Sequence, residues 1–127
     1  MNPETVKLVF KHLPLRMHDQ AEPAALAAIA AQNQGKFWQM HDALFGVEKL
    51  TKESIEAAAA SIGLNMEQFK KDLADPVTKQ RLYKDMADAK KADVSGTPTL
   101  FINGQRIKNR SLPAMQAIID RELKAGK

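Results

Sequence analysis

The chain has 127 residues, a length that suits one domain with a hydrophobic core, and no apolar run approaches membrane-spanning length. The net charge of +4 favours a nucleic-acid partner only weakly, because acidic residues are interleaved with the lysines and no basic aromatic platform is present, so we expect none. Cysteine is absent, which excludes a disulfide, a zinc–thiolate site and a nucleophilic thiol within these residues.

The first predicted element is a strand from Thr5 to His12, because apolar and β-branched side chains alternate there with lysines. Pro14 ends this strand, since proline cannot donate to a continuing ladder. The residues before it lack the basic, apolar and small-residue series of a signal peptide, so we expect no signal peptide in this chain.

Helical spacing of apolar residues predicts five helices in the middle of the chain. We expect them at about 19–33, 36–45, 52–62, 66–75 and 76–93. Thr51 and Asn65 are the expected N-caps of the third and fourth helices, and Asn65 with Gln68 resembles a capping box. Pro76 suits the first turn of the fifth helix.

A loop, a buried strand and a tight turn are predicted from Ser95 to Gly104. Pro98 suits the position just before a strand at 99–102, and Asn103-Gly104 is a strong signal for a hairpin that returns through 105–107. Ser111 then caps a last helix at 112–123.

This order of elements predicts an α/β fold, organised as a single domain over 1–127 with a helical insertion at about 19–75. We see no internal repeat or linker that would divide the chain.

Four segments in this order resemble the DsbA-like thiol–disulfide oxidoreductases of the thioredoxin fold. They are Lys7 to Leu15, the "GKFWQMHDALF" run from Gly35 to Phe45, Ile62 to Met66 followed by Phe69, and Val94 to Thr99. The resemblance implies a thioredoxin-like sheet with a DsbA-type helical insertion. The sheet is expected to be incomplete at the N-terminus, because the family's first strand and its Cys-x-x-Cys helix precede the position that matches Val6.

The resemblance also implies a function, namely oxidation or isomerisation of protein disulfides in the periplasm or cell envelope. In the family, the residues matching Thr97 and Pro98 form a cis peptide bond and contact extended substrate. No catalytic residue can be carried over, because the chemistry needs two sulfur atoms, and we expect no cofactor and no redox activity from this chain alone. The alternative is a non-catalytic module that binds peptides or mediates assembly through the same loop and its open strand edges.

The absent first strand has a structural consequence. In the thioredoxin fold it lies between the strands that match Val6–Lys11 and Thr99–Ile102, so both would keep open edges. We expect a second copy, a separate N-terminal segment or direct pairing of the two strands to close the gap, and we favour a homodimer.

The three histidines, His12, His18 and His41, match no metal-ligand spacing, and we expect no metal site. His41 and Asp42 are neighbours on a helix and are expected to point to different faces. No serine lies in a nucleophile-elbow context, which makes a serine hydrolase an unfavourable interpretation.

Overall fold

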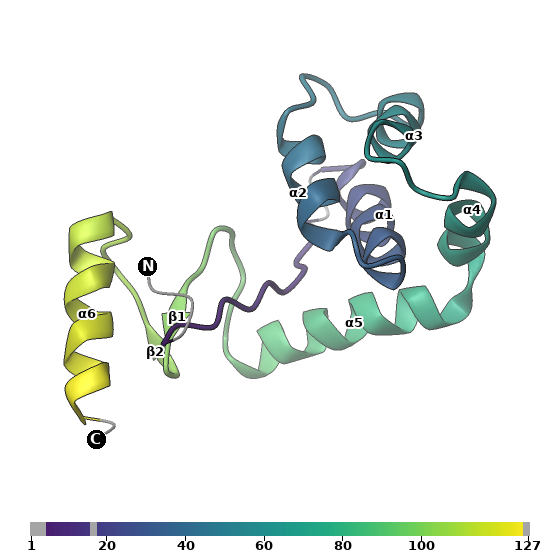
Figure 1. The fold of residues 1–127 in the computed structure, drawn as a ribbon. Coiled ribbons are helices and arrows are strands. Elements are labelled where there is room, and N and C mark those ends of the chain that lie inside the picture. Colours follow the sequence, from purple (N-terminus) through teal and green to yellow (C-terminus); the bar gives the residue numbers. More distant parts are fainter. Residues whose placement is uncertain (1–4, 16–17, 126–127) are drawn as a thin grey trace. The chain divides into compact units, whose positions relative to one another are not determined.

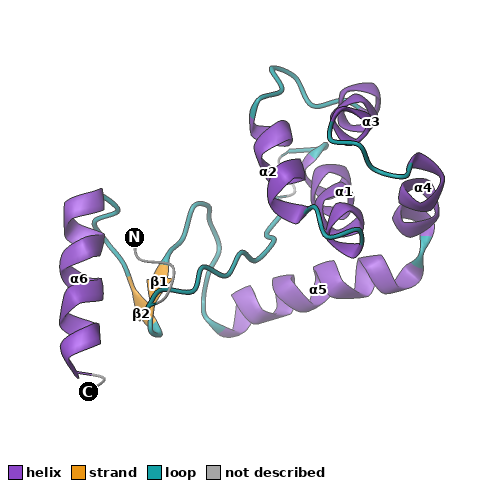
Figure 2. Cartoon of the chain, viewed as in Figure 1, coloured by secondary structure: helices purple, strands orange, loops and turns teal. Residues whose placement is uncertain are grey.

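The computed structural model describes residues 5–15 and 18–125 of the chain. Helices dominate these residues, and the strands are confined to one hairpin (Figures 1 and 2). The elements are α1 (Ala21–Asn33), α2 (Phe37–Phe45), α3 (Lys52–Ser61), α4 (Met66–Ala74), α5 (Pro76–Lys91), β1 (Phe101–Ile102), β2 (Gln105–Arg106) and α6 (Leu112–Ala125).

The chain divides into two compact units. The helical unit runs from His12 to Asp93 and contains α1 to α5. The hairpin unit combines the chain before His12 with the chain after Asp93, and contains β1, β2 and α6. Each unit has its own internal contacts.

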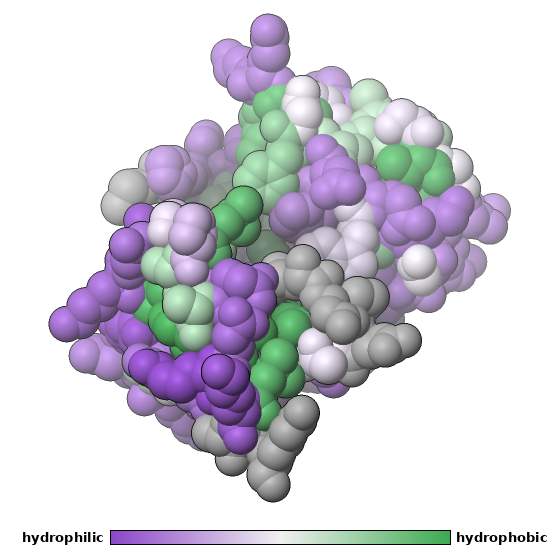
Figure 3. Space-filling view, turned by 60° about the vertical axis from the view of Figure 1, so that its left-hand side comes forward, coloured by the Kyte–Doolittle hydropathy of each residue, from purple (hydrophilic) through white to green (hydrophobic). Residues whose placement is uncertain are grey.

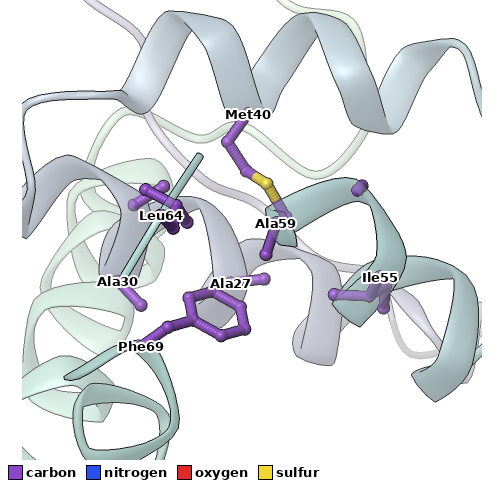
Figure 4. Close-up of a cluster of buried hydrophobic side chains, with 9 residues drawn as sticks. Ala27, Ala30, Met40, Ile55, Ala59, Leu64 and Phe69 are labelled. Carbon is purple, nitrogen blue, oxygen red and sulfur yellow. The ribbon is translucent and has the colours of Figure 1, made fainter. Parts of the chain in front are cut away.

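The core of the helical unit is built around α1, which contacts each of the other four helices of that unit. Its alanines allow this, because small side chains let neighbouring helix backbones approach closely. Ala27 and Ala30 on α1 are fully buried, as are Met40 on α2 and Phe69 on α4 (Figure 4). These four side chains belong to one cluster of buried residues that holds the helices together.

Helix caps confirm two of the predicted N-termini. The Thr51 hydroxyl accepts the Ser54 backbone N–H at 3.0 Å, and the Ser54 hydroxyl accepts the Thr51 N–H at 2.8 Å, which completes a capping box. Asn65 accepts the Gln68 N–H at 3.1 Å. The reciprocal bond predicted for Gln68 is replaced, because the Asn65 N–H donates instead to the Gln34 side-chain oxygen at 2.8 Å.

The hairpin unit contains a short antiparallel pair in which Phe101 faces Arg106 and Ile102 faces Gln105. The predicted Asn103-Gly104 turn is confirmed, with φ angles of +49° and +82°, a conformation that asparagine and glycine tolerate. The Ile107 N–H also donates to the Leu100 carbonyl at 2.9 Å, and the Ser111 hydroxyl accepts the Ala114 N–H at the start of α6.

One strand prediction was wrong, and another was confirmed only in part. Residues 6–11 form no strand, and they do not pair with β1 in the part of the chain that the structure describes. The stretch predicted as a buried strand at 99–102 forms a ladder only at Phe101 and Ile102, and Phe101 is 42% exposed. Alternating side chains define the two faces of a strand, but a strand needs a neighbouring backbone to pair with.

Candidate functional site

The loop that carries Thr97 and Pro98 lies in the hairpin unit, just before β1. Both residues are exposed, and the peptide bond between them is cis. The Thr99 hydroxyl donates to the Gly96 carbonyl at 2.6 Å, which closes the loop on itself. The two residues predicted to contact substrate are thus displayed on the surface of this unit.

Arg110 is a residue of this site that the sequence did not indicate. Its guanidinium Nη1 donates to the Pro98 carbonyl oxygen at 2.5 Å, although the two residues are twelve positions apart. The β1–β2 hairpin reverses the chain between them and brings them together. No local spacing or motif signals this contact, because it depends on where the returning chain runs.

Two further arginines are anchored close to the hairpin. The Arg106 guanidinium carbon lies 5.4 Å from the centre of the Phe101 ring, a cation–π distance. Arg121 on α6 donates from Nη2 to the Gln105 side-chain oxygen at 2.9 Å. The exposed strand pair therefore carries positive charge on its side chains.

A second group of chemically active side chains lies in the helical unit. His12 is 8% exposed, its ring meets the Phe37 ring edge-on at 5.8 Å, and its backbone N–H donates to Asp85 Oδ2 at 2.9 Å. Burial lowers the pKa of His12, Asp85 opposes this shift, and Arg81 and His41 add to it. A buried, neutral imidazole in an aromatic setting fits a packing role.

The prediction that His41 and Asp42 point to different faces was wrong. His41 Nδ1 lies 3.1 Å from Asp42 Oδ1, because rotation about the side-chain bonds lets adjacent helical residues meet. The His41 ring also lies 4.5 Å from the Phe45 ring. Among the described residues, no group of three or more histidine, aspartate or glutamate side chains is arranged to hold a metal ion.

No helix within residues 5–15 and 18–125 combines the length and apolar character needed to cross a bilayer. The exposed loop offers hydroxyl groups, backbone groups and the Arg110 guanidinium, and the sequence has no cysteine.

The structure defines a mostly helical, thioredoxin-like fold with a small two-stranded sheet. It is similar to the crystal structure of a thioredoxin-like oxidoreductase from Silicibacter pomeroyi DSS-3, with a TM-score of 0.81 and 28% identity. The match covers 91% of this chain and 68% of that one. The chain belongs to the thioredoxin family, since the family model described as Thioredoxin matches residues 1–121.

Curated relatives with a different kind of name share part of their length with this chain. The Na(+)/H(+) antiporter NhaA 3 of Salinispora tropica is 40% identical over 104 residues, which is 80% of this chain and 16% of that protein. The Na(+)/H(+) antiporter NhaA 1 of Mycolicibacterium vanbaalenii is 39% identical over 123 residues, which is 94% of this chain and 19% of that protein. The chain thus spans less than a fifth of the length of these relatives.

Proposed function

We propose that the chain is the substrate-contacting part of a DsbA-like thiol–disulfide oxidoreductase and performs no thiol chemistry by itself. The exposed Thr97–Pro98 loop, set in a thioredoxin-like fold that has no cysteine, is the observation that carries this proposal. In this proposal the DsbA-type insertion is the part of the helical unit at about 19–75, which holds α1 to α4, and both units belong to one domain. The resemblance to the DsbA-like family alone supports a location in the cell envelope.

The proposal predicts that the 127-residue chain binds extended peptides but does not catalyse insulin reduction by dithiothreitol. Thiol exchange requires a thiolate that attacks the disulfide and a second thiol that resolves the mixed disulfide, and the chain has neither. Turnover of insulin by the purified chain would contradict the proposal.

Measuring peptide binding by two variants tests whether the Thr97–Pro98 loop is the surface that contacts peptide. We expect Pro98→Ala to weaken binding of an extended peptide, because it alters the surface that the proposal gives to substrate. Pro113→Ala is the matched control, since this proline is also exposed in the hairpin unit but lies in the first turn of α6. Equal binding by both variants would show that the loop is not the contact surface.

A non-catalytic module is the second function, in which peptide capture or assembly is the whole role of the chain. It is favoured by the absence of cysteine and by relatives in which the matching segment is a small fraction of proteins named as antiporters. The coding sequence upstream of Met1 separates the two functions. A Cys-x-x-Cys segment in frame there supports the oxidoreductase, and continuous coding sequence without one supports the module.

A further inference from the structure

The cationic side chains beside the Thr97–Pro98 loop bear on which peptides the loop would select. The chain from Val94 to Ile119 holds three cationic residues, Arg106, Lys108 and Arg110, and no aspartate or glutamate. This stretch therefore carries a continuous excess of positive charge.

Arg110 is the cation that the structure fixes at the loop itself. Its bond to the Pro98 carbonyl uses one of the five N–H donors of a guanidinium. The residue is exposed, and no carboxylate among the described residues pairs with it. Held in this way, the guanidinium can donate to a ligand while it remains bonded to Pro98.

Among the described residues of the hairpin unit, the acidic side chains are Asp120 and Glu122, and both lie on α6. Asp120 on α6 accepts the Gln116 side-chain amide at 2.9 Å. Arg121, on the same helix, is bonded to Gln105 of β2 and not to the loop. An acidic ligand at the loop would meet the positive charge of Arg110 there.

We propose that the loop binds extended peptides that carry an acidic side chain, and that Arg110 is the residue that selects them. This inference rests on the proposed function, since it needs peptide to bind at Thr97 and Pro98. A carboxylate can accept two parallel N–H bonds from a guanidinium, a geometry that a neutral amide does not reproduce. The carboxylate would share the guanidinium with the Pro98 carbonyl.

The test compares two fluorescein-labelled ten-residue peptides of alternating threonine and valine, one with two glutamates and the other with two glutamines in their place. Fluorescence anisotropy measures the affinity of the full chain for each. We expect the acidic peptide to bind about threefold to tenfold more tightly at low ionic strength, since exposed ion pairs are modest and screened by salt. Adding 0.5 M NaCl is expected to remove most of this preference.

Three variants assign the preference to one residue. Arg110→Gln is expected to bind both peptides nearly equally, and Arg110→Lys to retain part of the preference, because the charge stays but the planar fork is lost. Arg121→Gln is the control, since it removes the same charge from a guanidinium that is bonded to Gln105 and not to the loop. It is expected to keep the preference.

The outcomes separate this inference from the proposed function. If the unmodified chain binds both peptides with equal affinity, or if Arg110→Gln and Arg121→Gln lose the preference equally, selection by Arg110 is wrong while peptide binding stands. If the unmodified chain binds neither peptide, the proposed function and the inference both fall.

Discussion

Phe69 shows how much one side chain contributes to the helical unit. It is fully buried and lies near Ala27 and Ala30 of α1 (Figure 4). We expect Phe69→Ala to lower the free energy of unfolding by about 3–5 kcal/mol, because burial is lost and a cavity is left among side chains that cannot close it. Urea unfolding followed by circular dichroism measures the loss.

The matched control for Phe69 is another phenylalanine of the same unit. Phe45 is 77% exposed, and its ring contacts the His41 ring. Phe45→Ala should therefore cost no more than about 1 kcal/mol. Similar losses in the two variants would show that the burial of Phe69 does not hold the unit together.

His12 makes stability depend on pH. Burial lowers the pKa of His12 in the folded chain below the ordinary value of 6.5. The unfolded chain therefore binds more protons than the folded chain as the pH falls through and below that value. Stability is therefore lost on acidification in this range. We expect urea unfolding of the unmodified chain to show a lower free energy at pH 5.5 than at pH 7.5.

Substituting His12 tests whether this residue causes the pH dependence of stability. His12→Gln should reduce the difference in stability between the two pH values, while the exposed His18 gives a control in His18→Gln. If His12→Gln keeps the full difference, other groups account for the pH dependence.

At the scale of elements, the capping box at the start of α3 decides where that helix begins. Thr51→Ala removes the acceptor for the Ser54 N–H and is expected to lower the free energy of unfolding by about 1 kcal/mol. Thr51→Ser keeps a hydroxyl at the same place and should remain close to the unmodified chain. Thermal and urea unfolding of the two variants measure the difference, and equal losses would mean that the cap contributes little.

The helices and the strands differ in how well local sequence predicts them. A helix closes its hydrogen bonds within one segment, so the apolar spacing, the cap at Thr51 and the first-turn proline Pro76 located helices to within a few residues. A strand closes its bonds with another segment. Residues 6–11 have a strand-like pattern, and nevertheless no ladder forms there in the described chain.

At the scale of the whole molecule, apolar side chains at the surface predict self-association. Leu8 and Val9 are each 62% exposed, and apolar side chains lie between hydrophilic ones on the face seen in Figure 3. We expect the purified chain to form a homodimer at micromolar concentration, because burying these side chains is favourable and an open strand edge accepts another strand.

Light scattering across a dilution series measures the molar mass of the chain in solution and so tests the predicted homodimer. Leu8→Lys combined with Val9→Lys should shift the chain toward monomer, and Val77→Lys, an equally apolar exposed position on α5, is the control. A monomer down to low micromolar concentration for the unmodified chain would contradict the dimer.

Some residues of the candidate site were predicted from the sequence, and one was seen only in the structure. Thr97 and Pro98 were predicted as substrate contacts from the resemblance to the DsbA-like family, and the structure places both on an exposed loop. Arg110 was not found, since its place beside Pro98 follows from the path of the chain through the hairpin.

The sequence by itself determined the helices, their caps, the Asn103-Gly104 turn and the absence of thiol chemistry, because each depends on residues close together in the chain or on composition alone. Only the tertiary structure decided which apolar segments pair as strands, that His12 is buried beside Phe37, and that a guanidinium is fixed at the exposed loop. These features join residues far apart in the sequence, and their energies exist only once the chain has brought them into contact.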